Sequence, residues 1–179
     1  MPDRLVYDGQ WLLWNTPGDG EPAQKYRATS GMPGHQAIVD QCLKDTGPIP
    51  AGSYYFTLAL DPRKYAKDDG SGSCRLVPSQ RIQQIPRGTA AGECEPYWSN
   101  WGKNRVRIEP ADSATRTACT PARSGFYIHD STKGFSHGCI EVDPVFFNRL
   151  TRYAKKARGR RIVVEVKYAH TSTYGNTLK

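Results

Sequence analysis

The sequence of 179 residues lacks any long apolar run. No stretch approaches the roughly 20 apolar residues that a membrane-spanning helix needs, so membrane insertion is not expected. The first nine residues, MPDRLVYDG, also lack the basic and then apolar build of a secretory signal. No internal repeat or linker-like stretch divides the chain. We therefore expect one domain over residues 1–169, followed by a polar tail over residues 170–179 that frays.

Acidic residues are scarce relative to basic ones. The chain has 17 Asp and Glu against 25 Lys and Arg, a formal net charge of +8. Such an excess favours an anionic partner, which could be nucleic acid, the carboxylates of a cell wall or an acidic protein. The densest basic run, residues 155–161, lies at the end of a predicted helix, where cations complement the helix dipole. Because the chain also shows no paired-carboxylate metal site, we expect no nucleic-acid partner and no cofactor.

Histidine is rare too, yet two of the four histidines precede a cysteine within one segment, FYIHDSTKGFSHGCIEV, over residues 126–142. Its first four residues are typical of a buried strand that ends at His129. Ser136, His137 and Gly138 then indicate a tight turn that delivers Cys139 to a second short strand. A cysteine nucleophile needs a thiol, an imidazole to take its proton, and backbone N–H groups to hold an oxyanion. This segment supplies all three.

In this hypothesis Cys139 is the nucleophile, and His129 increases its thiolate fraction by forming a thiolate–imidazolium pair. The other ring nitrogen of His129 would be oriented by Asp130, Ser131 or a backbone carbonyl. The Cys139 amide and a neighbouring amide would hold the oxyanion.

Two other interpretations of the same residues stay open. In the first, they are an ordinary buried thiol and ordinary core or surface imidazoles. In the second, His129, His137 and Cys139 bind zinc, although a fourth ligand is not evident and the spacing is unlike the common zinc patterns.

Setting Cys139 aside leaves an even number of cysteines, which allows two disulfides in three connectivities: Cys42, Cys74, Cys94 and Cys119. Two disulfides would imply an oxidising working compartment. Cys74 and Cys94 both lie in residues 61–103, a stretch dominated by Gly, Pro, Ser and charged residues. We predict that a disulfide between them holds this stretch together. Three aromatic residues near the end of this stretch would either cover the core or form a wall of a substrate groove: Tyr97, Trp98 and Trp101.

Short strands dominate the remaining pattern. They are expected at residues 5–7, 10–14, 25–29, 52–60, 104–109, 126–129, 140–142 and 162–166. One convincing helix is expected at about residues 144–158, where Phe146, Leu150 and Tyr153 recur at helical spacing. Asp143 is its predicted N-cap, with Pro144 at the first helical position. The fold is therefore expected to be mainly β, a sandwich or barrel with one packed helix.

The segment Ser136-His137-Gly138-Cys139 resembles the Ser/Thr-His-Gly-Cys signature of the L,D-transpeptidase (YkuD-type) catalytic domain, and His129 matches the upstream catalytic histidine of that family. Residues 47–54, GPIPAGSY, resemble its Pro-x-Gly-x-Tyr segment, and residues 30–31 give a weaker match. Together the matches extend over about residues 5–166. The resemblance implies a β-sandwich with a short helix.

The resemblance also implies the chemistry. Cys139 would attack the carbonyl of the third residue of a peptidoglycan stem peptide, expel the terminal D-Ala and leave a thioester. Water would resolve the thioester in an L,D-carboxypeptidase, and an amine would resolve it in a transpeptidase or a D-amino acid exchange. Candidate substrate contacts are Asp130 and the three aromatic residues above. The rival functions are a cysteine amidase or endopeptidase that cuts another stem-peptide bond, and a non-catalytic wall-binding module.

The chain departs from the housekeeping members of that family, which commonly have Arg or Asn two residues after the cysteine, where this chain has Glu141. Its loop from His129 to Cys139 is short, and a peptidoglycan-binding repeat is lacking. In these traits it is similar to L,D-transpeptidase-type toxins delivered by type VI secretion. That similarity implies synthesis in the cytoplasm without a signal peptide, action in the periplasm of a target cell, and a periplasmic immunity protein as partner. Earlier removal of a signal would explain the same features.

Overall fold

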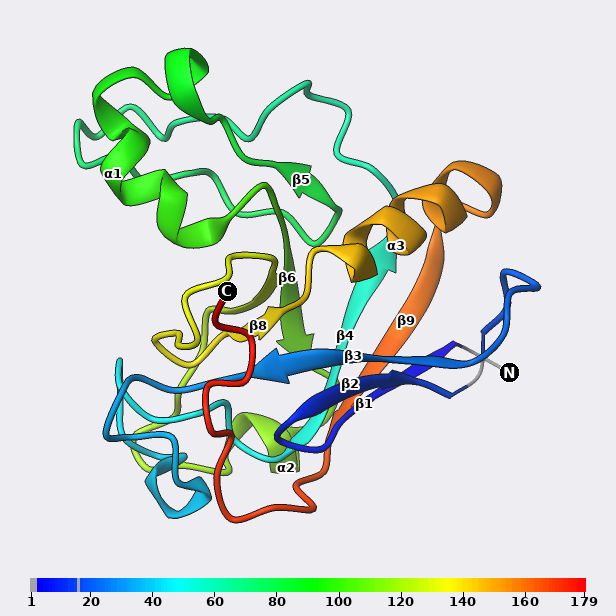
Figure 1. Cartoon of the computed structure of the whole chain (residues 1–179), viewed down its shortest axis with the longest axis vertical. Coiled ribbons are helices and arrows are strands. Elements are labelled where there is room, and N and C mark those ends of the chain that lie inside the picture. Colours follow the sequence, from blue (N-terminus) through cyan, green and yellow to red (C-terminus); the bar gives the residue numbers. More distant parts are fainter. Residues whose placement is uncertain (1–2, 16) are drawn as a thin grey trace.

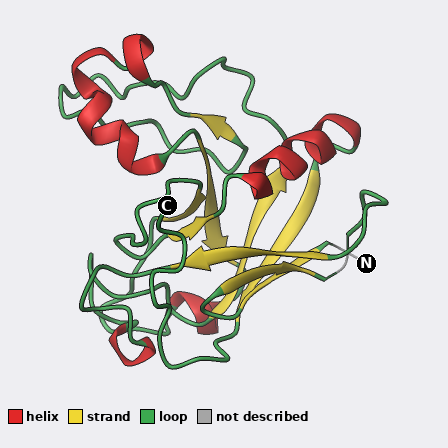
Figure 2. Ribbon diagram, viewed as in Figure 1, coloured by secondary structure: helices red, strands yellow, loops and turns green. Residues whose placement is uncertain are grey.

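The computed structural model describes residues 3–15 and 17–179, and its main feature is a strongly curved sheet (Figures 1 and 2). The strands are β1 (Arg4–Tyr7), β2 (Trp11–Trp14), β3 (Gln24–Thr29), β4 (Gly52–Leu58), β5 (Gln83–Gln84), β6 (Asn104–Pro110), β7 (Phe126–His129), β8 (Ile140–Val142) and β9 (Arg160–Val166). They are ordered β4-β9-β1-β2-β3-β8-β7-β6-β5, and β4 also pairs with β6. That extra pairing closes eight of the strands into a barrel and leaves β5 outside.

The barrel interior follows from the alternation of side chains along each strand. Leu5 and Tyr7 of β1 point inward, as do Leu12 and Trp14 of β2, whereas the residues between them are only partly buried. Two pairings are parallel, β1 with β9 and β7 with β8, and the hairpin pattern predicts neither. These observations confirm the expected mainly β fold.

Helix α3 (Val145–Lys156) packs on the barrel where the helix was expected. It buries one face, made of Phe146, Phe147, Leu150, Tyr153 and Ala154. Asp143 Oδ1 accepts a hydrogen bond from the Val145 N–H at 3.0 Å, which satisfies one of the free donors at the helix start. Pro144 lies at the boundary of the helix, immediately before its first residue.

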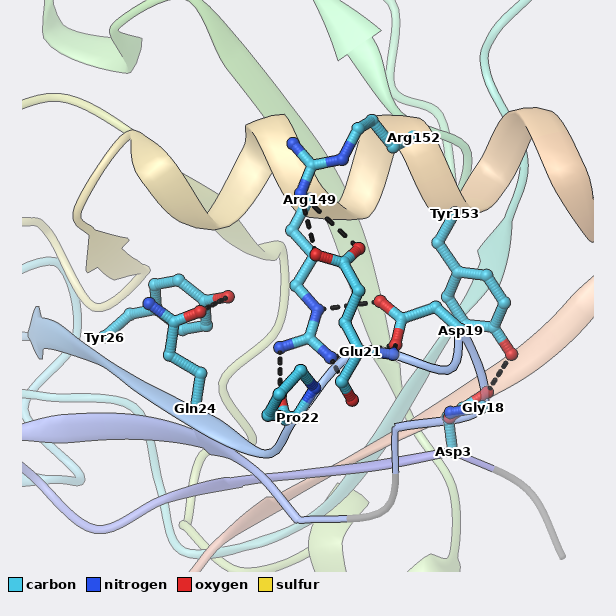
Figure 3. A network of polar contacts seen from close by, with 10 residues as sticks. All are labelled: Asp3, Gly18, Asp19, Glu21, Pro22, Gln24, Tyr26, Arg149, Arg152 and Tyr153. Carbon is cyan, nitrogen blue, oxygen red and sulfur yellow. Dashed lines mark hydrogen bonds and ion pairs between the residues drawn. The ribbon is translucent and has the colours of Figure 1, made fainter.

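A buried ion pair fastens the segment before β3 to this helix (Figure 3). Arg149 donates from Nε and Nη2 to the two carboxylate oxygens of Asp19, at 2.7 and 2.8 Å. It also donates to the carbonyls of Glu21 and Pro22, and its guanidinium lies 4.5 Å from the centre of the Trp14 ring. All but 3% of the Arg149 side chain is buried, so the charge depends on these partners.

Residues 59–103 form an excursion from the barrel with a small apolar core of its own. It contains β5, the short helix α1 (Glu95–Trp98) and the 3₁₀ turns η2 (Gly88–Ala90), η3 (Gly92–Cys94) and η4 (Ser99–Trp101). Its core consists of Ala66, Leu76, Ile85, Ala91 and Trp98. Cys74 and Cys94 are joined within it, as predicted. In Figure 1 the excursion lies at the top, beside α3.

Two further short helical elements lie outside the one helix expected from the sequence. They are the turn η1 (Ile38–Asp40) and the helix α2 (Ser113–Arg116). Asp112 caps α2 by accepting from the Thr115 N–H at 2.7 Å. In the part of the chain that the structure describes, none of the helices is both long and apolar enough to cross a membrane.

The polar tail does not fray, so that expectation is wrong. Thr173 and Thr177 are buried, and the Thr173 hydroxyl donates to the Ser30 carbonyl at 2.7 Å. Thr177 donates to the carboxylate of Glu141. Figure 1 shows the red C-terminal segment beside β8. Hydroxyl groups, rather than apolar side chains, hold the tail in place, and hydrophobic periodicity does not report such contacts.

Candidate active site

The candidate site is built on one face of the neighbouring strands β6, β7 and β8. Their register sets Arg105 opposite His129, and His129 opposite Glu141. Tyr127 lies two positions before His129 on β7, and Cys139 lies two positions before Glu141, immediately ahead of β8. Because side chains alternate along a strand, both belong to this same face. Val106, Ile128 and Ile140 point to the other face and are fully buried in the core. The barrel thus supports a polar row on an apolar wall.

This polar row continues into the strands on both sides. Gln83 of β5 is opposite Arg105, and Thr29 of β3 is opposite Glu141. The five residues paired across these strands are each at most 3% exposed: Gln83, Arg105, His129, Glu141 and Thr29. Buried polar groups of this kind need hydrogen-bond partners. Arg105, for example, donates to Gln83 at 2.8 Å, and its guanidinium lies 4.5 and 4.4 Å from the ring centres of Trp101 and Tyr127.

A cavity of about 530 Å³ opens over this face, and Cys139 and His129 both line it. Each of the other four cysteines is in a disulfide, Cys42 with Cys119 and Cys74 with Cys94, which leaves Cys139 as the free thiol. The thiol is partly exposed. The remaining wall residues come from three segments of the chain: Lys44 and Asp45, Tyr97 to Trp101, and Pro121 to Phe126.

The turn before Cys139 has the geometry that its sequence suggested. Gly138 has φ = 120°, a conformation that residues with a Cβ rarely adopt, and a Cβ there would clash with the Arg123 guanidinium. Ser136 Oγ donates to the Cys139 carbonyl at 2.5 Å and accepts from the Gly138 N–H at 3.3 Å. Ser30 Oγ donates to the Gly138 carbonyl at 3.2 Å. Ser136 and Gly138 therefore shape the turn that presents the thiol.

Burial shifts the pKa of each candidate catalytic group toward its uncharged form. It raises the pKa of Cys139 to about 11, although the Tyr127 backbone and then Arg105, Lys133 and Arg123 act in the opposite direction. Burial also lowers the pKa of His129 to about 3, aided by the charges of Lys133 and Arg105 and opposed by a hydrogen bond with the Trp101 backbone. These pKa shifts favour a thiol and a neutral imidazole at neutral pH over the thiolate–imidazolium pair suggested by the sequence.

His137 lies at the mouth of the cavity and is exposed. Its Nδ1 is 2.9 Å from the Asp45 carbonyl oxygen, and its own carbonyl accepts from Arg123 at 3.4 Å. These contacts join the turn to the wall formed by Lys44 and Asp45. Among the described residues, 3–15 and 17–179, no group of three His, Cys, Asp or Glu side chains could hold a metal, so the zinc alternative has no support.

The proposed substrate contacts divide into two pairs. Tyr97 and Trp101 line the cavity, and the Trp101 ring lies 5.4 Å from the His129 ring, edge to face. Trp98 instead fills the core of the excursion, where its indole N–H donates to the Cys74 carbonyl at 2.7 Å. Asp130 points away from the cavity. We therefore no longer expect Trp98 and Asp130 to contact substrate.

Asp130 has a structural role in its own right. Its carboxylate accepts from the backbone N–H groups of Lys103 and Asn104 at 2.7 and 2.9 Å, and from the Asn104 side chain at 2.9 Å. Burial raises its pKa despite these hydrogen bonds. Asp130 thus ties the end of the excursion to the strand that carries His129. The contact to the His129 ring comes instead from Ser131, whose Oγ is 3.1 Å from Nδ1.

Sequence reasoning missed Lys44, Arg105 and Lys133. It also missed Arg123 and the position of Glu141. Arg123 donates to the carbonyls of Gln41, Pro48 and Gly47 and so braces the cavity wall. Glu141 was noted only as a departure from the family pattern, yet it is fully buried and accepts several hydrogen bonds. A charged residue inside a short apolar strand, as in Ile-Glu-Val, was the available signal for Glu141.

Comparison with known proteins supports the resemblance noted in the sequence. The family model of the L,D-transpeptidase catalytic domain (YkuD) matches residues 10–166, which is most of the chain. A comparison with curated protein sequences gave no match. The match covers the barrel strands other than β1, helix α3, and the face that carries His129 and Cys139. The chain therefore belongs to the YkuD family of L,D-transpeptidase catalytic domains, whose activity is peptidoglycan modification.

Proposed function

We propose that Cys139 is the nucleophile of an L,D-carboxypeptidase or L,D-transpeptidase that acts on peptidoglycan stem tetrapeptides. One observation carries the proposal: the free thiol and the buried imidazole of His129 share one face of adjacent strands and line one cavity. Tyr97 and Trp101 provide apolar wall for the peptide, and Lys44 and Lys133 provide positive charge for its carboxylates.

The reaction starts from the neutral pair. As Sγ of Cys139 bonds to the carbonyl carbon of the third stem residue, its proton passes to His129, and the oxyanion is held by the Cys139 amide with a neighbouring amide. The C–N bond to the terminal D-Ala then breaks, and the leaving amine takes the proton from His129. The thioester that remains is resolved by water in the carboxypeptidase reaction, or by an amine in cross-linking or D-amino acid exchange.

Purified muropeptide tetrapeptides, incubated with the wild type and with Cys139→Ala, test this proposal by mass analysis. We expect loss of one D-Ala, or its exchange for an added D-amino acid, with the wild type alone. Thermal unfolding of both proteins controls for folding. Undiminished activity in Cys139→Ala would falsify the nucleophile assignment. Cleavage at another stem-peptide bond would identify an amidase or endopeptidase, and binding without any cleavage would identify a wall-binding module.

The two histidines are separated by a second experiment. His129→Ala should slow acylation by roughly 10² or more, because the base is lost. His137→Ala should have a smaller effect, since His137 is exposed and bonded to the Asp45 carbonyl. If the reverse order were measured, His137 would be the base.

We further propose that the protein is an antibacterial effector of the type VI kind, active in the periplasm of a target cell and neutralised there by an acidic immunity protein. Support comes from the similarity to such toxins, the two disulfides, which suit an oxidising compartment, and the net charge of +8. Directing the wild type to the periplasm of a test bacterium should stop its growth, whereas cytoplasmic expression and periplasmic Cys139→Ala should not. Growth arrest by periplasmic Cys139→Ala would contradict the proposed effector role.

A further inference from the structure

Glu141 is a buried carboxylate next to the candidate active site that the proposed peptide chemistry does not use. The register of β7 and β8 sets it opposite His129, and its side chain has no exposed surface. Oε1 accepts from the Gly134 N–H at 2.8 Å and from the Thr177 hydroxyl. Oε2 accepts from the Ser131 hydroxyl. Because a backbone N–H can only donate, Oε1 of Glu141 serves here as an acceptor, and Oε2 is the acceptor for Ser131.

Ser131 connects this carboxylate to His129. Its Oγ is hydrogen-bonded to Oε2 of Glu141 and lies 3.1 Å from Nδ1 of His129. A hydroxyl has a single hydrogen, and the hydrogen bond to Glu141 uses it. Oγ can therefore only accept from the ring, which requires that Nδ1 carries the ring proton.

We propose that Glu141, acting through Ser131, fixes His129 in the Nδ1–H tautomer and so leaves the lone pair on Nε2 as the base for the Cys139 proton. Glu141 and Ser131 are positioning residues in this scheme. Its catalytic part rests on the proposed function, whereas the tautomer itself does not.

One competing arrangement exists, because the Trp101 backbone also hydrogen-bonds to the His129 ring. If the neutral ring donated to it from Nε2, Nδ1 would become an acceptor and the Ser131 hydrogen would have to turn toward the ring. Oε2 of Glu141 would then lose that donor in a place where water does not reach it, since Glu141 is fully buried and Ser131 is 5% exposed. A buried carboxyl oxygen left without its donor is less favourable than an alternative ring tautomer, so the geometry favours Nδ1–H.

The decisive experiment is a long-range ¹H–¹⁵N correlation spectrum of histidine-labelled protein, which reports the tautomer of each ring without any substrate. The signals of His129 are identified by their loss in His129→Ala. We expect Nδ1–H for His129 in the wild type, and a mixture of tautomers or Nε2–H in Ser131→Ala and Glu141→Gln. The matched control is Ser53→Ala, which removes another serine–glutamate hydrogen bond, the 3.1 Å contact of Ser53 with Glu165 between β4 and β9. It should leave the His129 signals unchanged.

Kinetics give the second readout. The rate constant kcat for release of D-Ala should fall roughly 10- to 100-fold in Ser131→Ala, with KM within a few fold, because the base is misoriented while the cavity persists. An Nε2–H tautomer in the wild type would overturn the proposal, and so would a tautomer that Ser131→Ala leaves unchanged. If Glu141→Gln fails to fold, the wild-type and Ser131→Ala spectra still decide. If the tautomer is as expected but the wild type releases no D-Ala, the proposed function fails and the positioning inference stands.

Discussion

At the scale of single residues, burial dominates the chemistry of His129 and Cys139. Three cations, Arg105, Lys133 and Arg123, lower the pKa of the thiol, but loss of solvation raises it more. The imidazole is neutral for the same reason. In the proposed reaction the proton therefore moves during attack rather than before it, so the orientation of His129 matters more than its basicity.

A pH profile of thiol alkylation tests the neutral pair. Cys139 is the free cysteine, so iodoacetamide labelling followed by mass analysis reports on it alone. Since the pKa is about 11, the labelling rate should rise roughly tenfold per pH unit from pH 6 to 9. A rate that is flat over this range, and that drops in His129→Ala, would instead show a resting thiolate–imidazolium pair.

Protonation of His129 also links the site to stability. Its pKa is about 3 in the folded protein and has the ordinary value of 6.5 when unfolded, so the unfolded chain binds the extra proton first as the pH falls. The stability contribution of the neutral ring is complete above pH 6.5 and is lost progressively between 6.5 and about 3. Urea unfolding of the wild type and His129→Ala across this range should show a shallower acid loss in the variant. If the stability of the two proteins fell in parallel with pH, the ring of His129 would not be buried and neutral in the folded protein.

At the scale of elements, the attachment of α3 to the barrel depends on apolar packing and on one buried ion pair. The apolar face of the helix was readable from its spacing. The partner of Arg149 was not, because Asp19 lies 130 residues earlier in a segment without regular structure. Long-range polar contacts of this kind follow from the fold and not from any local pattern.

Two arginines of α3 provide a matched pair of variants. Arg149→Leu should destabilise the protein by about 3–5 kcal/mol, because it leaves Asp19 buried without its partner. Arg152→Leu should cost less than about 1 kcal/mol, since its pair with Glu21 is exposed. Chemical denaturation of both variants measures the difference. Equal losses in the free energy of unfolding would mean that the ion pair of Arg149 with Asp19 does not hold α3 to the segment before β3.

At the scale of the whole molecule, two disulfides hold the walls of the cavity. Cys42–Cys119 joins the segment before Lys44 and Asp45 to the segment before Pro121, and both segments line the cavity. Cys74–Cys94 instead lies within the excursion and packs against its small core. The first bridge therefore constrains the domain, and the second mainly a part of it.

Removal of each bridge should separate these roles. The bridges close loops with sequence separations of 77 and 20 residues, for which loop entropy gives about 4.5 and about 3.3 kcal/mol, respectively. We expect Cys42→Ala/Cys119→Ala to lower the midpoint of global unfolding. Cys74→Ala/Cys94→Ala should increase amide hydrogen exchange in residues 59–103 while the barrel stays protected. Uniform loss of protection in the second variant would contradict an independent excursion.

The local sequence determined the eight barrel strands, the position of α3, the turn before Cys139 and the family, because alternation, helical spacing and glycine conformation act over a few residues. It also indicated the pairing of Cys74 with Cys94, which lie within one irregular stretch. It did not predict β5, which lies in the irregular stretch. Only the tertiary structure decided that Trp98 and Asp130 are structural, that the tail packs, and that Glu141 lies behind His129. These outcomes depend on which distant groups the closed barrel brings together, and on how much water it excludes from them.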